Sequence, residues 1–381
     1  MRFLRKKPAM AVLAITVLGL LAAPLASTRN PSTARAAEMV PLGVYSGPAK
    51  PQLVRDFEAT HKVDVKYALD YLASDNWSTI DDPSWWIDGW KESGYEVIWS
   101  VPMLVDGATL AQGAAGHYDH HFRSFAQALN NAGLGDATIR LGWEFNLSGS
   151  KWFAGNDPSQ WSTYWRRIVN TMRSVSPHFR FDWCANAGPS NMNPELAYPG
   201  DAYVDVIGMD AYDGPWLGST PEQRWSNNLN QPYGLKWHAS FAAAHSKPMS
   251  YDEWALMNED NPLYIHNMHD WFKTNDVAWV SYFDTVWGSN DSRLSPHSMS
   301  AAAFTQAFGS GTSPAPEPSP GPIGARSGLR NLSPGPGATI RARGAPLGRG
   351  LHPRRGYLQK RCISGVACQR RDMERRQAPE G

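Results

Sequence analysis

The sequence predicts an α/β protein whose central region is a (β/α)8 TIM barrel. Three observations indicate this fold: eight short strand-like runs, helical patterns between them, and a central region (38–309) close to the ~250 residues of a typical barrel. Strands of this kind are short, apolar runs bounded by turn residues. The runs are Leu42–Tyr45, Val65–Asp70, Glu96–Met103, Thr138–Asn146, Arg180–Asn186, Val204–Asp213, Pro248–Trp254 and Val277–Asp284.

The clearest helix prediction covers residues 158–175. Asp157 is a suitable N-cap, and Pro158 fits the first helical turn. Apolar residues then recur at helical spacing, namely Trp161, Tyr164, Trp165, Ile168 and Met172. A second helix carries Phe122, Phe125, Ala126 and Leu129 on one face. Because strands and helices alternate, the sheet should be parallel, and eight units in one domain favour a closed barrel over a doubly wound sheet.

The N-terminal segment has the pattern of a secretory signal peptide. Residues 1–7 are basic, and residues 9–23 are an uninterrupted run of apolar residues, Gly and Thr. This run is shorter than the ~20 residues that a membrane span needs. Small residues at Ala34 and Ala36 suit a cleavage site. We therefore expect residues 1–37 to be removed and the mature protein to be secreted and extracellular; the alternative is an uncleaved membrane anchor.

The C-terminal part differs in composition from the rest of the chain. Residues 310–325 form a Pro/Ser/Gly linker, which should be extended and semi-rigid. Residues 326–381 are a basic, low-complexity tail without Trp or Phe and with Tyr357 as its one Tyr. Such a composition does not supply a core, so disorder is expected. Cys362 and Cys368 lie in this tail and receive no role.

Charge and cysteine content exclude several classes. The formal net charge is +1, but both ends are basic, which leaves residues 38–325 strongly acidic. An acidic surface is a poor match for nucleic acid or an anionic membrane. With 3 Cys in the whole chain, a disulfide scaffold is excluded. The central region holds Cys184 alone and must be stable without a disulfide.

Side-chain alternation along three strands gathers polar residues inside the barrel. In residues 138–146, Arg140, Gly142, Glu144 and Asn146 share one face, and Ile139, Leu141, Trp143 and Phe145 share the other. The apolar face should pack on the helices, with Glu144 at the barrel mouth. By the same rule Tyr251 and Glu253 share a face, and so do Gly208, Asp210 and Tyr212. Barrel enzymes place their chemistry at these strand ends.

Two glutamates at the ends of strands four and seven suit glycoside hydrolysis. That reaction needs one carboxyl to protonate the leaving oxygen and another, ionised, to attack the anomeric carbon. Strands four and seven lie on opposite sides of an eight-stranded barrel, so Glu144 and Glu253 can converge. The alternative is a purely structural ion pair, for example between Glu144 and Arg140. Each glutamate stands beside a Trp, Trp143 or Trp254, which favours a sugar site.

These motifs resemble those of glycoside hydrolase family 26, a family of retaining barrel enzymes rich in β-mannanases. The resemblance rests on Arg140-Leu-Gly-Trp-Glu-Phe-Asn146 and Ser250-Tyr-Asp-Glu-Trp-Ala255, and covers most of 40–309, including Gly43–Gly47. It implies that residues 38–309 are the catalytic domain, with Glu144 as proton donor and Glu253 as nucleophile. Asn146 matches a family Asn, and Tyr212 matches a Tyr that orients the nucleophile.

Two departures from the family pattern concern the substrate. Trp143 stands where the family usually has His, and Asp252-Glu-Trp-Ala255 replaces the more usual Ser-Glu-Phe-Gly. The expected substrate is a β-1,4-linked plant polysaccharide cut internally, β-mannan first, with β-1,4-glucan (cellulose) as the alternative. Mixed-linked glucan, xylan and a microbial polysaccharide stay open. Linkers like residues 310–325 often lead to a carbohydrate-binding module. The basic tail is therefore either a genuine disordered tail or the out-of-frame translation of such a module.

Aromatic residues in the expected βα loops suit sugar rings, which stack their C–H faces on aromatic side chains. The candidates are Trp85, Trp86, Trp90, Trp152, Trp216 and Trp287. From the strands and loops together, the residues expected to bind or orient substrate are Arg140, Trp143, Asn146, Trp152, Asp210, Tyr212, Trp254 and Trp287. The polysaccharide substrate is the expected partner. We expect a monomer that does not bind membranes once the signal peptide is cleaved.

Other classes of function fit less well. His117, His120 and His121 cluster, but zinc needs three or four ligands with supporting groups, so no metal and no cofactor are expected. No GxSxG elbow, GxGxxG turn or P-loop is present, which disfavours a serine hydrolase or a nucleotide-binding protein. A sugar-binding barrel without catalysis is the rival from a different class, and the presence of both glutamates disfavours it.

Overall fold

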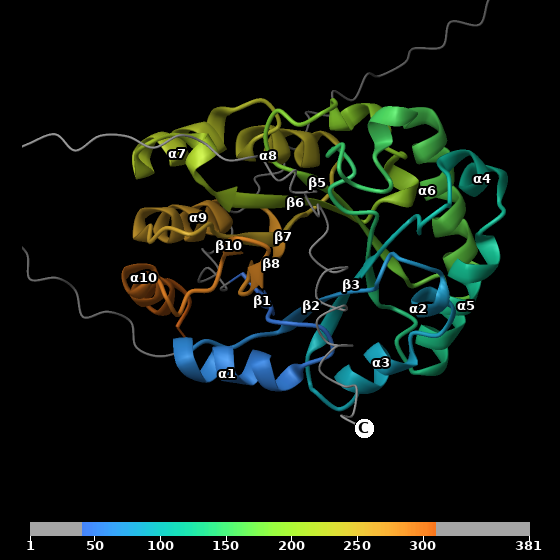
Figure 1. Ribbon diagram of the computed structural model, residues 1–381, viewed down its shortest axis with the longest axis horizontal. Coiled ribbons are helices and arrows are strands. Elements are labelled where there is room, and N and C mark those ends of the chain that lie inside the picture. The colour runs from blue at the N-terminus through green and yellow to red at the C-terminus, as the bar shows by residue number, and fades with distance from the viewer. Residues whose placement is uncertain (1–39, 310–381) are drawn as a thin grey trace, which may run out of the picture. The chain divides into compact units, whose positions relative to one another are not determined.

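The computed structural model describes residues 40–309, and within them eight parallel strands close into a barrel. Helices surround the barrel on the outside (Figure 1). The predicted (β/α)8 fold is confirmed. The barrel strands are β1 (Leu42–Tyr45), β2 (Tyr67–Tyr71), β3 (Glu96–Val101), β4 (Thr138–Leu141), β5 (Arg180–Asn186), β6 (Val206–Asp213), β7 (Met249–Leu256) and β8 (Val277–Phe283).

Pairing between the first and last strands closes the barrel. In β1, Leu42 pairs with Val280 and Tyr45 with Phe283, both in parallel register with β8. Each of the eight predicted runs overlaps an observed strand, and the bounds of β1 and β5 are as predicted. The other six strands differ from their predicted runs at one or both ends, most of all β4, which ends at Leu141. Closure leaves no free sheet edge, so every barrel strand is hydrogen-bonded on both sides.

The helices follow the strands in order, with one exception. The crossover from β5 to β6 contains only two short 3-10 turns, Pro194–Ala197 and Asp201–Tyr203. Gly188 and Gly200 in this loop have positive φ, which breaks a helical path. The α-helices are α1 (Pro51–His61), α2 (Ser78–Asp81), α3 (Ser84–Trp90), α4 (Leu110–Ala115), α5 (Asp119–Asn131), α6 (Pro158–Arg173), α7 (Pro221–Asn230), α8 (Leu235–Ala244), α9 (Pro262–Thr274) and α10 (Ser298–Phe308).

Helix α6 forms as its sequence predicts. The Asp157 carboxylate accepts a hydrogen bond from the Gln160 amide, and Pro158 occupies the first turn. All five apolar residues predicted for its inner face are buried. The four predicted for α5 are buried as well. Their burial against the strands fixes both helices to the barrel wall.

Strand β4 ends five residues before its predicted end, at Leu141. Gly142 and Glu144 both have left-handed φ, +53° and +50°. A Cβ at position 142 would lie 2.5 Å from the Met103 sulfur, so glycine is needed there. The prediction of unbroken alternation to Asn146 is therefore wrong. Trp143 turns away from the helices toward the barrel mouth, where its ring lies 5.2 Å from that of Tyr71.

Strand β7 contains an irregularity that reverses part of its predicted pattern. Its register with β6 shifts so that Ser250 pairs with Gly208 but Glu253 pairs with Asp210. Between these two pairs, β7 has one residue more than β6, and this bulge directs both Asp252 and Glu253 inward. Tyr251 instead points outward, where its hydroxyl accepts a hydrogen bond from Trp271 of α9. The prediction that Tyr251 and Glu253 share a face is wrong.

The predicted signal peptide, linker and basic tail lie outside the described residues. Among residues 40–309, none of the helices combines the length and apolarity that crossing a membrane requires. Val63 and Gly309 form an isolated antiparallel bridge, which brings the end of the described chain back to the loop before β2.

Trp254 lies in the packed wall of the barrel, and this placement is testable. It is fully buried and its ring contacts those of Tyr264, Tyr282 and Phe304. Trp254→Ala should lower the free energy of unfolding by about 3–5 kcal/mol, because a large cavity is left. Trp85→Ala, at a Trp that is 55% exposed, is the matched control and should cost less than about 0.5 kcal/mol. Equal denaturant midpoints for the two variants would contradict this placement.

Candidate active site

Glu253 lies at the centre of a buried group of hydrogen-bond donors. Its Oε1 accepts hydrogen bonds from the Tyr71 hydroxyl (2.6 Å) and from Nη2 of Arg140 (2.9 Å). Its Oε2 accepts one from the Tyr212 hydroxyl. Burial raises the pKa of both tyrosines well above the usual value, so both phenols keep the proton that they donate. Three donors on one carboxylate favour its ionised form.

Arg140 is fully buried and links Glu253 to the barrel interior. Its Nη2 is shared between Glu253 and Asp210 of β6, while Nη1 donates to Tyr71 and to Ser100 of β3. Asp210 accepts a further hydrogen bond from the backbone N–H of Glu253 (3.1 Å). Asp210 therefore fixes both the side chain and the backbone around Glu253, and the predicted inward face of Asp210 and Tyr212 is as observed.

Glu144 follows β4 in a strained backbone conformation. A left-handed φ on a residue with a side chain costs on the order of 1–3 kcal/mol and persists only where the surroundings hold it. Two contacts do so: the Glu144 N–H donates to the Cys184 carbonyl (3.0 Å), and Nδ2 of Asn186 donates to its Oε1 (2.7 Å). The turn holds the carboxyl beside the end of β5.

The electrostatic environment of Glu144 differs from that of Glu253. Burial, and next the negative charge of Glu253, raise the pKa of Glu144 to about 7. Asn186 and Arg140 oppose this rise. Glu144 therefore keeps a proton near neutral pH, while Glu253 is held by donors that favour its charge. A proton donor paired with an ionised carboxylate is the arrangement that acid-assisted displacement needs.

Asn146 positions Asn186, which in turn contacts Glu144. Its Nδ2 donates to the Asn186 carbonyl and to Ser190, and its Oδ1 accepts from the Asn186 backbone N–H. With its amide fully used, Asn146 places Asn186, and Asn186 contacts Glu144. Asn186 and Tyr71 were both missed by the sequence analysis. Each stands at the last position of its strand, which was the available signal.

The predicted Trp residues fall into two groups. Trp143 is partly exposed, with the Arg140 guanidinium 5.6 Å from its ring centre, so it lines the site. Trp152 is buried and donates its indole N–H to the Trp143 carbonyl (2.6 Å), so it supports Trp143. Trp254 lies in the outer wall and does not reach the site, which corrects its predicted role.

The remaining loop Trp residues differ in exposure. Trp287 is partly exposed on a short hairpin of β9 (Val286–Trp287) and β10 (Asn290–Asp291), and its indole nitrogen has no hydrogen-bond partner among the described residues. Trp90 is buried and donates to Asp70 (2.6 Å). Trp85 and Trp216 are 55% and 63% exposed.

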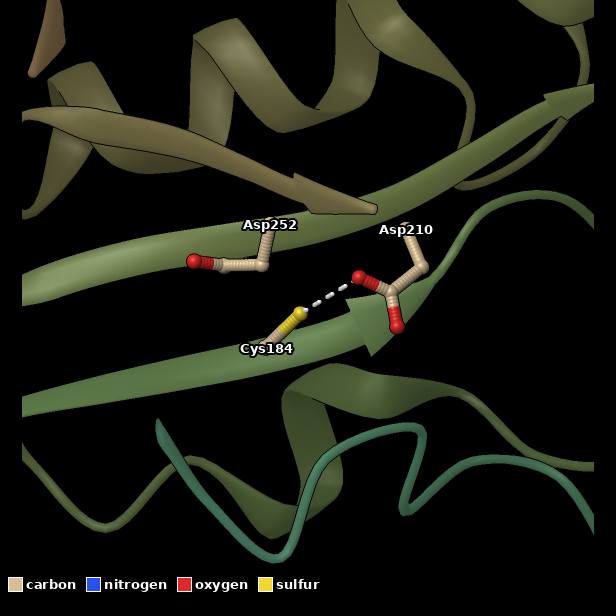
Figure 2. Close-up of side chains that lie close together, drawn as sticks. All are labelled: Cys184, Asp210 and Asp252. Carbon is tan, nitrogen blue, oxygen red and sulfur yellow. Dashed lines mark hydrogen bonds between the residues drawn. The ribbon is translucent and has the colours of Figure 1, made fainter. Parts of the chain in front are cut away.

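Among residues 40–309, none of the three histidines belongs to a group of three potential metal ligands, although the rings of His120 and His121 lie 3.8 Å apart. His121 stacks on Trp77, and its Nδ1 lies 2.6 Å from Asp81. One candidate group of metal ligands occurs among residues 40–309, formed by Cys184, Asp210 and Asp252 (Figure 2). The Arg140 guanidinium already faces both aspartates of this group. A metal ion there would meet that positive charge, so the donor set does not fit a cation.

The comparisons with known proteins identify the segment that carries both glutamates. Residues 127–287 match the family model described as glycosyl hydrolase family 26. These residues are a glycosyl hydrolase family 26 segment. The resemblance drawn from the two sequence motifs is confirmed, and the protein is a glycoside hydrolase. No curated protein matches the chain.

Solved structures of family 26 enzymes share the barrel at low identity. A Cellulomonas fimi endo-β-1,4-mannanase double mutant is 14% identical, with 72% of this chain and 71% of that one covered, and a TM-score of 0.55. The catalytic domain of a Bacillus sp. JAMB-750 family 26 endo-β-1,4-mannanase is 13% identical, with 71% and 86% covered, and a TM-score of 0.53. These likenesses support the fold.

The raised pKa of Glu144 predicts how stability depends on pH. Below its ordinary pKa of 4.5, Glu144 is protonated in both folded and unfolded chains, and the folded state loses no stability. As pH rises through about 7, the folded state must bury a charge, and stability falls. Glu144→Gln should therefore raise Tm relative to wild type above pH 7 and not below pH 4.5. Glu92→Gln, at an exposed residue, is the control. A Tm difference that is the same at both pH values would contradict the raised pKa.

Proposed function

We propose that this family 26 glycoside hydrolase is a secreted, retaining endo-β-1,4-glycanase. The observation that carries the proposal is the contrast between its two glutamates. Glu253 accepts hydrogen bonds from Arg140, Tyr71 and Tyr212, whereas Glu144 has a pKa of about 7. In a retaining mechanism these are the properties of a nucleophile and of an acid/base residue, respectively.

The first step is a displacement at the anomeric carbon. The ionised Glu253 attacks this carbon, the glycosidic bond breaks, and Glu144 gives its proton to the departing oxygen. The sugar is then held as an ester on Glu253. Because Glu253 is no longer charged once it carries the sugar, its contribution to raising the Glu144 pKa disappears. A lower pKa suits Glu144 to its second role, as a base.

The second step regenerates the enzyme. Glu144, now a carboxylate, removes a proton from water, and the water oxygen attacks the anomeric carbon. The ester bond to Glu253 breaks, and the product leaves with its original anomeric configuration. Arg140, Tyr71 and Tyr212 stabilise the returning charge on Glu253. The protein, the polysaccharide and water supply all the atoms of this cycle.

β-1,4-Mannan is our first substrate proposal. The solved family 26 structures described above are endo-β-1,4-mannanases, and the two sequence motifs agree with that family. Trp143 beside Arg140 is the observation that favours a second candidate, β-1,4-glucan. A flat indole there offers stacking in place of the hydrogen bonds of the usual His, which changes how a sugar next to the cleaved bond is recognised.

A substrate panel tests the proposal. Purified protein is incubated with galactomannan, carboxymethylcellulose, barley β-glucan and xylan, and reducing ends are counted. Glu253→Ala and Glu144→Ala should each lower kcat by at least about 1000-fold while keeping the wild-type circular dichroism spectrum. Activity on galactomannan alone supports the mannanase proposal, and preference for carboxymethylcellulose replaces it with the glucanase. Near wild-type turnover by either variant would contradict the two-glutamate mechanism.

Azide separates the two roles. In Glu253→Ala, this small anion can take the space of the missing carboxylate and attack the anomeric carbon once. Rescue should yield a glycosyl azide of inverted configuration, identified by NMR of the product. Azide should yield the opposite, retained configuration in Glu144→Ala, where the nucleophile is intact. Retained product from Glu253→Ala would overturn the assignment.

Two exposed Trp residues lie after the ends of β2 and β6. The Trp85 ring packs edge-on against Trp86 (4.8 Å), and Trp86 donates its indole N–H to the Tyr71 carbonyl at the end of β2. Trp216 follows Tyr212 by four residues, beyond the end of β6. Strands β2 and β6 stand opposite each other in the eight-stranded order. A polysaccharide laid from β2 to β6 would stack on both rings and pass over Glu253.

This path predicts an effect that depends on chain length. Trp85→Ala and Trp216→Ala should each lower kcat/KM on polymer about tenfold, because each removes one stacking contact on the order of 1–2 kcal/mol. Cleavage of a short aryl glycoside should stay within about twofold, since it does not reach either ring. Equal losses on polymer and short substrate, or none on polymer, would contradict the path. Leu196→Ala, at an exposed apolar residue of the β5–β6 loop, is the control.

A further inference from the structure

Two aspartates meet inside the barrel below Glu253, and the mechanism above does not use them. Asp182 lies on β5 and Asp252 on β7, and neither is exposed to solvent. The strand between them is β6, which has glycine at the point where they meet. A Cβ on Gly208 would lie 2.5 Å from Oδ1 of Asp182 and 2.5 Å from Oδ2 of Asp252. Because Gly208 has no side chain, the carboxyls of Asp182 and Asp252 can approach each other over it.

The hydrogen bonds at this meeting point require a proton on the pair. The Ser250 Oγ lies 2.8 Å from Oδ2 of Asp182 and 2.9 Å from Oδ2 of Asp252. A hydroxyl has one proton and donates to one of these oxygens only. The other oxygen makes a favourable contact at that distance only if its own carboxyl donates to Ser250. Oδ1 of Asp182 is buried and has no partner among the described residues, as expected of a carboxyl that is not charged.

The charges around the pair lead to the same conclusion. Arg140 is the cation that faces it, with Nε 3.9 Å from Oδ2 of Asp252. Arg140 already forms ion pairs with Asp210 and Glu253. His238 of α8 also faces Asp252, but burial lowers its pKa to about 4 and leaves it neutral. The thiol of Cys184 donates to Asp210 (Figure 2). Two further ionised carboxylates would leave this interior without compensating charge.

We propose that Asp182 and Asp252 share one proton and act as a positioning pair that holds Arg140 toward Glu253. The inference rests on the proposed role of Glu253 as nucleophile. With one proton, the pair has a single negative charge, which attracts Nε of Arg140 from below while Nη2 remains on Glu253 and Asp210. With none, the pair would draw the guanidinium away from Glu253. Asp252 stands where the family motif more usually has Ser.

The environment of Asp182 supports the shared proton. Burial, and next the charge and the hydrogen bond of Asp252, raise its pKa well above the usual range. A pKa that is raised on folding contributes stability at low pH, and this stability is lost as pH rises through the folded value.

Infrared spectroscopy tests the shared proton without any substrate. At pH 8, where Glu144 and Asp70, each with a pKa of about 7, are mostly ionised, wild type should retain a carboxylic-acid C=O band. Asp182→Asn and Asp252→Asn should each remove this band, because either variant leaves one ionised carboxylate. Asp276→Asn, at an exposed aspartate, should keep it. A band that survives both single substitutions, or is absent from wild type, would overturn the shared proton.

Stability and turnover test the positioning role. Asp182→Asn should raise Tm relative to wild type at pH 9 but not at pH 5, since the variant has no proton to lose. The double variant Asp182→Asn/Asp252→Asn removes the negative charge below Arg140, and its loss in kcat should exceed the product of the two single losses by about tenfold, with KM unchanged. Multiplicative losses would reduce the pair to a structural role. Because the infrared and Tm measurements need no substrate, they still decide the shared proton if Glu253 proves not to be the nucleophile.

Discussion

The fully buried guanidinium of Arg140 is the interaction on which the site depends. It rises from β4 and binds Asp210 of β6, Glu253 of β7, Tyr71 of β2 and Ser100 of β3. One side chain therefore ties together five strands of the barrel. Its charge allows carboxylates to occupy an interior that would otherwise reject them. The same charge acts on both catalytic candidates: it is a direct partner of Glu253 and lowers the pKa of Glu144.

The two glutamates reach the site through departures from regular strand geometry. Glu144 stands in a left-handed turn after Gly142, and Glu253 follows the register shift of β7. Both departures change the direction of neighbouring side chains: Trp143 turns toward the barrel mouth and Tyr251 turns outward. Each is stabilised by the barrel: the Cys184 carbonyl binds the Glu144 N–H, and Asp210 binds the Glu253 N–H. A rigid fold thus stabilises the local strain that the chemistry requires.

The sequence was sufficient to predict the barrel, its eight strands and the β6 residues that contact Glu253. Alternation placed Asp210 and Tyr212 correctly because β6 is regular over that stretch. It failed for Tyr251 and Trp143, where a bulge and a left-handed turn change the direction of the side chains, and one sequence does not reveal such a change. Tyr71 and Asn186 were missed because a lone polar residue at a strand end has many ordinary roles.

The central claim is that Glu253, held by Arg140, becomes covalently bonded to the sugar. The most direct measurement is mass spectrometry of the protein after incubation with an activated 2-deoxy-2-fluoro glycoside matching the polymer it cleaves. The fluorine slows the second step, so the ester accumulates. The account predicts one added sugar on the peptide that contains Glu253, and none in Glu253→Ala. A sugar attached to Glu144, or turnover with inversion and no adduct, would contradict it.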